Sequence, residues 1–271
     1  MKMTANRRIA LNIAATYARN IYKLALGLIT ARWLLLSLGK TDYGLLGVVG
    51  GLIAFVTFFN RILSSSVSRF YAVSIGATKR KGNKEKGLEE CRRWFTAALS
   101  VHTVVPFILV LLGYPLGTWA VREFLTIPPD RVEACIWVWR FTCLSSLTGM
   151  INVPFRAMYN AKQEIAELTI YSVAETTLNA ILLWYMINHP GDWLAKYALW
   201  HCLIAISPRI LICLRAIRVY PECRIRRDCL WNWPDIRKMA SFAGWNALGA
   251  AGRILRGQGI AILVNKMFGP V

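Results

Sequence analysis

Basic side chains lie inside stretches of this chain that are otherwise apolar enough to cross a membrane. Arg19 and Lys23 are four residues apart and Arg253 and Arg256 are three apart, so each pair shares one face of a helix. A charge at the bilayer centre costs roughly 2.5–3.5 kcal/mol, and such cations bind phosphate and carboxylate groups. The sequence therefore predicts a positively charged cavity that binds an anionic substrate through Arg19, Lys23, Arg140, Arg253 and Arg256. Structural ion pairing is the alternative.

One carboxylate stands out against this basic excess. Glu175 lies about ten residues into the apolar stretch 165–188, close to the bilayer midplane at ~1.5 Å per residue. It is interpreted either as the counter-charge of Lys23, Arg140 or another cation, or as an ion-coupling carboxyl that alternates between protonated and ionised forms during transport.

Two further arginines lie beside prolines. Pro154 and Pro208 are each within two residues of an arginine, Arg156 and Arg209. Because proline removes a helix hydrogen bond and tends to kink the helix, we interpret these positions as hinges near a polar site. For Arg209 the alternative is a side chain that reaches the membrane interface from a helix end.

The composition is that of an all-α polytopic membrane protein. Hydrophobic residues make up 56% of the 271 residues and charged residues only 17%, with a mean hydropathy of +0.41. Lipid leaves no water to satisfy an open backbone, so each apolar run is read as a helix. About seven transmembrane helices are predicted, at 9–36, 45–68, 94–120, 132–157, 165–188, 193–217 and 240–265.

The net charge of +19 is placed unevenly. Basic residues crowd the N-terminus and the connections 69–93 and 215–238, whereas the alternate connections hold few. This positive-inside pattern predicts a multi-pass membrane protein with a cytoplasmic N-terminus. Nucleic acid is not an expected partner, because no platform of interleaved aromatic residues accompanies the basic loops.

Residues 7–39 and 237–269 align without a gap, which suggests that one transmembrane element is repeated. Lys23 and Arg253 occupy equivalent positions in the two copies. Such a repeat is typical of transporters, and here it predicts a parallel repeat. Residues 1–217 would form a six-helix half-bundle of a parallel-repeat transporter fold. Residues 218–238 would be a basic and aromatic cytoplasmic linker at the membrane interface, or a simple loop, and 239–271 the first helix of an incomplete second bundle.

Motifs for metal or catalytic chemistry are lacking in the sequence. Its seven cysteines are scattered without a CxxC pair, which favours buried free thiols over disulfides or zinc. A membrane glycosyltransferase or polymerase would need acidic or histidine clusters, and no DxD, paired-carboxylate or His-cluster motif is present. We therefore expect a protein that is not an enzyme and that uses no cofactor and no metal.

Three pieces of sequence carry a family resemblance that extends over essentially the whole chain. They are an LG-x-x-x-YG turn at Leu38, Gly39, Tyr43 and Gly44, a VPF at Val153–Phe155, and a QG…N…FGP run at Gln258, Gly259, Asn265, Phe268, Gly269 and Pro270. With the segments around them, they resemble bacterial polysaccharide and lipopolysaccharide biosynthesis proteins. These are O-antigen-type flippases of the superfamily that also holds the multidrug and toxin extrusion transporters.

The resemblance implies two six-helix bundles arranged as a V around a central cavity. It implies a location in the bacterial inner membrane and transport of an undecaprenyl-pyrophosphate-linked oligosaccharide to the periplasmic leaflet by alternating access. Membrane lipids, a glycan polymerase and glycosyltransferases are the implied partners. Two alternatives stay open: efflux of drugs or metabolites by a transporter of the same superfamily, and an inactive truncated half-transporter, since the family's second bundle is not matched after Val271.

Overall fold

The computed structural model describes residues 5–53, 64, 66–76, 84–225 and 230–254, which are helical and contain no strand. Seven labelled α-helices confirm the all-α prediction for this part of the chain, and residues 66–76 are also helical. The helices are α1 (Ala5–Gly51), α3 (Lys84–Trp119), α4 (Val132–Ile151), α5 (Val153–Ala161), α6 (Ile165–Asn188), α7 (Leu194–Val219) and α8 (Trp233–Ile254). A π-helical turn η1 (Ala120–Phe124) and the 3₁₀ turns η2 (Pro129–Arg131) and η3 (Pro221–Cys223) connect them.

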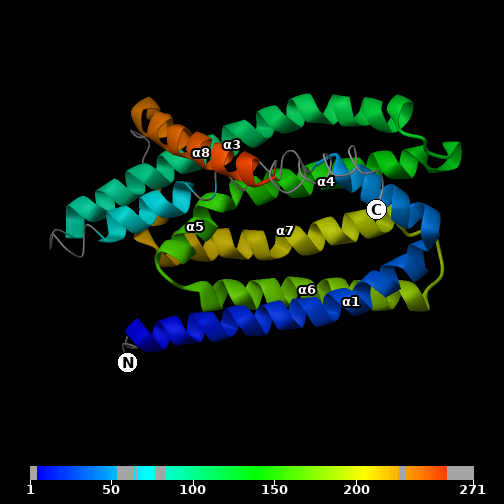
Figure 1. Ribbon diagram of the computed structural model, residues 1–271, viewed down its shortest axis with the longest axis horizontal. Helices are drawn as coiled ribbons and strands as arrows, with labels where there is room; N and C mark the ends of the chain where they lie inside the picture. Colours follow the sequence, from blue (N-terminus) through cyan, green and yellow to red (C-terminus); the bar gives the residue numbers. More distant parts are fainter. Residues whose placement is uncertain (1–4, 54–63, 65, 77–83, 226–229, 255–271) are drawn as a thin grey trace, which may run out of the picture.

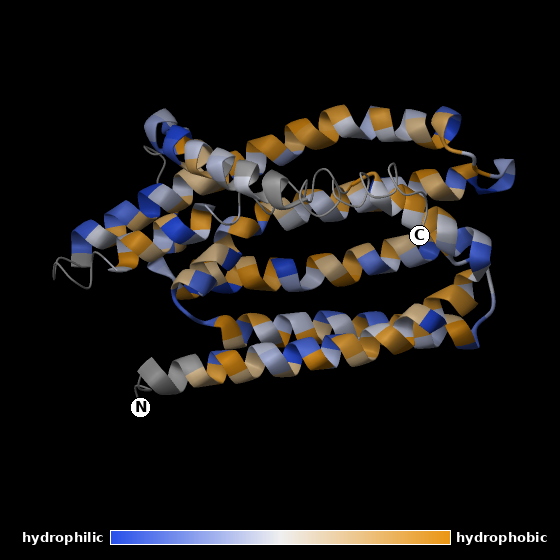
Figure 2. Cartoon of the chain, in the orientation of Figure 1, coloured by the Kyte–Doolittle hydropathy of each residue, from blue (hydrophilic) through white to orange (hydrophobic). Residues whose placement is uncertain are grey.

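Four helical segments are long and apolar enough to cross a membrane: Ala10–Gly51, Glu85–Phe124, Pro129–Ala161 and Ile165–Asn188. The shortest has 24 residues, about 36 Å at 1.5 Å per residue, against ~30 Å for the hydrocarbon core. These helices are those of a membrane protein. The ribbons of these four segments carry many hydrophobic turns, and hydrophilic turns lie part-way along α1 (Figure 2). Helix α7, which is outside this group, also has hydrophilic turns part-way along it.

Helix α7 is not among the four most apolar segments, although the sequence predicts a span at 193–217. It nevertheless runs beside them, between α6 and α4 (Figure 1). Leu203, Ile210 and Leu214, at spacings of seven and four, are exposed on one face, while Arg209 is half-buried. The lower hydropathy of α7 comes from the basic side chains along it, which are Lys196, Arg209, Arg215 and Arg218.

The glycine of the LG-x-x-x-YG motif sits at a sharp bend. Gly39 interrupts α1 with φ 76° and ψ 172°, a conformation that costs other residues a steric clash at Cβ. After this bend α1 turns back toward α4, where Leu45 and Val49 are buried (Figure 1). The predicted separation of two helices between 36 and 45 is thus made by one residue. Most of the predicted span 45–68 lies outside the described residues.

Pro154 begins a helix instead of kinking one. The predicted span 132–157 is divided at Asn152 into α4 and α5, and Pro154 occupies the first turn of α5, where no backbone N–H is needed. Pro208 does lie inside α7. There the Ser207 hydroxyl donates to the Ile204 carbonyl at 3.1 Å, which supplies the bond that proline cannot make.

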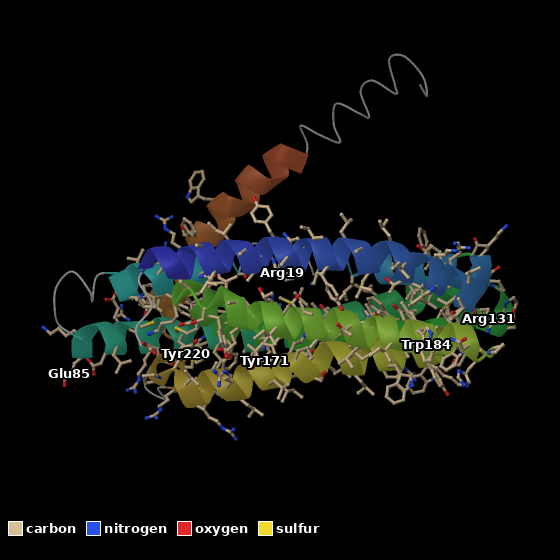
Figure 3. All side chains as sticks on the ribbon, turned by 90° about the horizontal axis from the view of Figure 1, so that it is seen from below. Arg19, Glu85, Arg131, Tyr171, Trp184 and Tyr220 are labelled. Carbon is tan, nitrogen blue, oxygen red and sulfur yellow. The ribbon has the colours of Figure 1, made fainter. Side chains whose placement is uncertain are left out.

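The basic connections gather at one end of the bundle. Arg92 Nε donates to the Pro221 carbonyl at 2.9 Å, and Lys162 pairs with Glu222. Arg131 marks the opposite end and Glu85 this one (Figure 3). The grouping agrees with the positive-inside pattern, and the cytoplasmic location of this end stays a prediction.

Helix α8 begins inside the predicted linker 218–238. Its first turns are fixed to the bundle by the Arg93–Asp235 ion pair at 2.9 Å. The Phe242 ring also packs edge-on against Phe70. Further along, α8 diverges from the bundle (Figure 3). The parallel repeat and the second bundle stay predictions, because residues 255–271 lie outside the described part.

Candidate anion-binding site

Charged side chains from four helices line one cavity of about 110 Å³ in the interior of the bundle. They are Lys23 of α1, Arg156 of α5, Glu175 of α6 and Arg209 of α7. Leu168, Tyr171 and Ser172 of α6 line the side of the cavity that is nearer the end of the bundle with the basic connections. We call this the charged cavity.

Packing between α1 and α6 places Lys23 opposite Glu175. These two helices lie side by side over most of their length (Figure 1). The Tyr22 hydroxyl is hydrogen-bonded to the Thr177 hydroxyl at 2.7 Å, next to Lys23 and two residues beyond Glu175. The same alignment is held near the helix ends, where Asn12 accepts from the Ala166 N–H at 3.3 Å and donates to the Gln163 carbonyl at 2.8 Å.

The charges in this cavity do not cancel. Three cations face one carboxylate. Glu175 interacts electrostatically with both Lys23 and Arg209, but among the described residues it forms no ion pair within 4.0 Å. Lys23 and Arg156 are exposed, whereas Glu175 and Arg209 are half-buried. The cavity is therefore a partly open site with an excess of about two positive charges, which favours an anion.

Arg209 is held firmly by α4. Its Nη1 donates to the Ser145 carbonyl, to the Ser145 hydroxyl at 3.2 Å and to the Thr148 hydroxyl at 2.9 Å. The guanidinium group also lies against Gly149, where a Cβ would make an ordinary van der Waals contact with it at 3.5 Å. All three bonds use Nη1, so they leave the donors on Nε and Nη2 for another partner.

A second cavity of about 390 Å³ lies on the other side of Arg209, between α4, α7 and the end of α1. We call it the hydroxyl cavity. Thr142, Ser145, Ser146 and Gly149 line it from α4 at spacings of three, one and three, which is one helical face. Its α7 wall includes Tyr197, His201 and Arg209, and its apolar wall includes Leu46 and Phe141.

Arg209 is the residue that the two cavities share, since it lines both of them. Beside it, His201 Nδ1 of α7 is hydrogen-bonded to the Asn179 side-chain oxygen of α6 at 2.7 Å. The Asn179 amide donates to the backbone carbonyl of Glu175, one turn earlier on α6, at 2.9 Å. Polar groups of α6 and α7 therefore lie close to Arg209 along both helices.

The structure brings together only some of the predicted site residues. Lys23 and Glu175 share the charged cavity, but Arg19 and Arg140 are not among its lining residues. Arg19 is bonded to the neighbouring Asn20 side chain at 3.2 Å. Arg140 donates to the Tyr114 hydroxyl at 3.0 Å and lies over the Trp137 ring at 4.5 Å. None of these partners lines the charged cavity.

The two predicted residues on the last helix do not contribute to this description. Arg253 belongs to the last turn of α8, where its side chain is not described, and Arg256 lies outside the described residues. Arg156 and Arg209 take part instead. The proline-based interpretation had placed them near a polar site without assigning them to the anion cavity. The hydroxyl face of α4 was missed, although its spacing is visible in the sequence.

In the described part of the chain, no group of three histidine, cysteine, aspartate or glutamate side chains is placed to hold a metal ion. Cys91, Cys135, Cys143, Cys202, Cys213 and Cys223 are free thiols there. Five of these six are buried, as expected for cysteines that pack as small apolar side chains.

Comparison of the chain with protein-family models, with curated proteins and with solved structures finds no match. The family resemblance therefore rests on the sequence motifs alone. The functional argument has to be made from the two cavities and from the charges that they place within membrane-length helices.

Proposed function

We propose that this protein transports an anionic, lipid-linked oligosaccharide across the bacterial inner membrane and binds its pyrophosphate in the charged cavity. One observation carries the proposal: Lys23, Arg156 and Arg209 converge around a single carboxylate between membrane-length helices. Charges within a membrane are costly, and those that are retained commonly mark a substrate or ion pathway. Three cations around one acid are an arrangement suited to a phosphate group.

The size of the charged cavity supports a phosphate group as its occupant. Its volume of about 110 Å³ is well below the ~300–1,000 Å³ of sites for larger small molecules, so it suits a small anionic group. A phosphate group is of this size, whereas an oligosaccharide is not. The remainder of the substrate would have to lie outside this cavity.

The outer surface of α1 suits the lipid part of such a substrate. Ile21, Leu24 and Leu28 form one face of this helix beside the face that carries Lys23, and they are 67–71% exposed. A polyprenyl chain lying in the bilayer against these side chains would place its phosphate within reach of the partly open charged cavity. The motif resemblance supplies undecaprenyl pyrophosphate as the carrier.

Glu175 has a role in this proposal as the exchangeable partner of the cations. Without substrate it balances part of the charge of Lys23 and Arg209. An arriving pyrophosphate would replace it as their partner, which links binding to a change around Glu175 and so to alternating access. Efflux of cationic drugs is disfavoured, because such cargo would be repelled by the excess positive charge.

Binding of undecaprenyl pyrophosphate to the purified chain in nanodiscs tests the proposal. The double substitution Lys23→Gln with Arg156→Gln should weaken binding at least tenfold, because each charge-assisted hydrogen bond contributes about 1.5–3 kcal/mol and tenfold corresponds to about 1.4 kcal/mol. Both side chains are exposed, so the fold should survive. Intrinsic tryptophan fluorescence is the measurement.

Arg19→Gln is the matched control, since it removes a cation from the same helix outside the cavity. It should leave binding unchanged. Undecaprenol, which lacks the pyrophosphate, should bind poorly to every variant. If the double variant binds undecaprenyl pyrophosphate as tightly as the unmodified chain, the cations are structural and the proposal is wrong.

A further inference from the structure

We infer that the hydroxyl cavity is the binding site for the first sugars of the transported glycan, so that one continuous track holds the pyrophosphate and the adjoining saccharide. This inference rests on the proposed function and extends it to the part of the substrate that would determine specificity. It depends on the lining of the cavity, on its volume and on the position of Arg209.

The lining has the chemistry that a sugar requires. Thr142, Ser145 and Ser146 present hydroxyl groups along one face of α4, and a hydroxyl group can both donate and accept. Phe141 and Tyr197 add aromatic rings. A sugar ring offers hydroxyl groups around its rim and C–H groups on its faces, so it can satisfy both kinds of wall.

The other candidates for this cavity fit less well. A polyprenyl chain would offer no hydrogen bonds to the hydroxyl groups of Thr142, Ser145 and Ser146, which can bond beyond their contacts within the protein. A second phosphate group would find only Arg209 as a permanent cation. The volume of about 390 Å³ lies within the ~300–1,000 Å³ range of small-molecule sites.

Arg209 fixes the order of the two parts of the substrate. It lines both cavities, so a phosphate bound to it is adjacent to whatever occupies the hydroxyl cavity. Tyr197 lies twelve residues before Arg209, about 18 Å along the axis of α7 and toward the start of this helix, where Asp192 pairs with Arg131 at 3.0 Å. The saccharide would therefore extend from Arg209 toward that end.

Two substitutions at Ser146 test the assignment without removing any cation. Ser146→Leu fills part of the hydroxyl cavity, and Ser146→Ala removes the hydroxyl group without adding bulk, which protects the test against misfolding of the leucine variant. Thr176→Leu is the matched control, because Thr176 bonds only within α6, to the Ser172 carbonyl, and lines neither cavity.

The probes are undecaprenyl pyrophosphate without sugar, and the same lipid carrying N-acetylglucosamine or galactose. We expect at least one sugar-bearing lipid to bind the unmodified chain tenfold or more tightly than the bare lipid. Ser146→Leu should abolish this difference and Ser146→Ala should reduce it severalfold. Binding of the bare lipid should stay unchanged in both variants, and Thr176→Leu should retain the full difference.

The possible failures are distinguishable. If the bare lipid does not bind, or binds regardless of Lys23 and Arg156, the proposed function is wrong. If it binds as proposed but neither sugar adds affinity, the saccharide site is wrong while the pyrophosphate site stands. A sugar-dependent gain that survives both Ser146 substitutions would also overturn the assignment, since the saccharide would then bind elsewhere.

Discussion

Gly117 of α3 packs directly against the side chain of Trp139 on α4. A methyl group there would lie 2.2 Å from Cε2 and Cζ2 of Trp139 and 2.7 Å from its Nε1. The indole is only 4% exposed, and its Nε1 donates to the Tyr114 carbonyl at 3.1 Å. Gly117→Ala should therefore push the ring aside by more than an ångström and break this hydrogen bond.

The expected cost combines three effects. Overpacking a buried contact costs about 1–3 kcal/mol, and the lost indole hydrogen bond about 0.5–1.5 kcal/mol. Alanine is the better helix former by up to about 1 kcal/mol, which offsets part of this loss. The net destabilisation is about 2 kcal/mol, or a fall in Tm of about 4–8 °C for a chain of this size.

Gly113→Ala is a close control, because it lies one turn earlier on α3 and a methyl group there would meet nothing within 4 Å. It should raise Tm slightly. Thermal unfolding of each purified variant in the same detergent, followed by tryptophan fluorescence, gives the comparison. Combining Gly117→Ala with Trp139→Leu should cost less than the two single changes added together. Equal Tm values for the two glycine variants would refute the packing argument.

The remaining predictions concern four single substitutions and use the same unfolding measurement. Arg131→Ala should destabilise the protein by about 3 kcal/mol, because it leaves Asp42, whose side chain is 7% exposed, without its cation at 3.3 Å. Asp192→Ala removes a 64% exposed partner of the same arginine and should cost no more than about 1 kcal/mol. Asn12→Ala should cost about 1 kcal/mol, since it removes the side-chain acceptor that caps the first turn of α6. Gln163→Gly should stabilise by up to about 1 kcal/mol, because Gln163 holds φ 60° in the left-handed region; a lower Tm would contradict this.

The sequence predicted the helices more accurately than the places where one helix ends and the next begins. Long apolar runs have only one way to satisfy their backbone in lipid, so the helices followed from composition. The bend at Gly39 was predicted as a turn, because the motif contains the residue that tolerates it. The break at Asn152 lies two residues before Pro154, where the sequence predicts a hinge, but the contact that accompanies it was not predicted. There the Asn152 amide donates to the Arg209 carbonyl at 2.9 Å on α7, a contact between helices that no local pattern encodes.

The positions of the charged residues were likewise predicted in part from the sequence and in part decided by the tertiary structure. The sequence by itself determined that cations would be retained within the helices and that Glu175 would be the acid among them, since composition and depth along a helix are local properties. Only the tertiary structure decided which cations meet. Arg140 is drawn to Tyr114 and Trp137, whereas Arg209 is anchored on α4 and turned toward Glu175. Helical periodicity identifies residues on one face of one helix, but the neighbour that this face meets depends on how the helices rotate and pack.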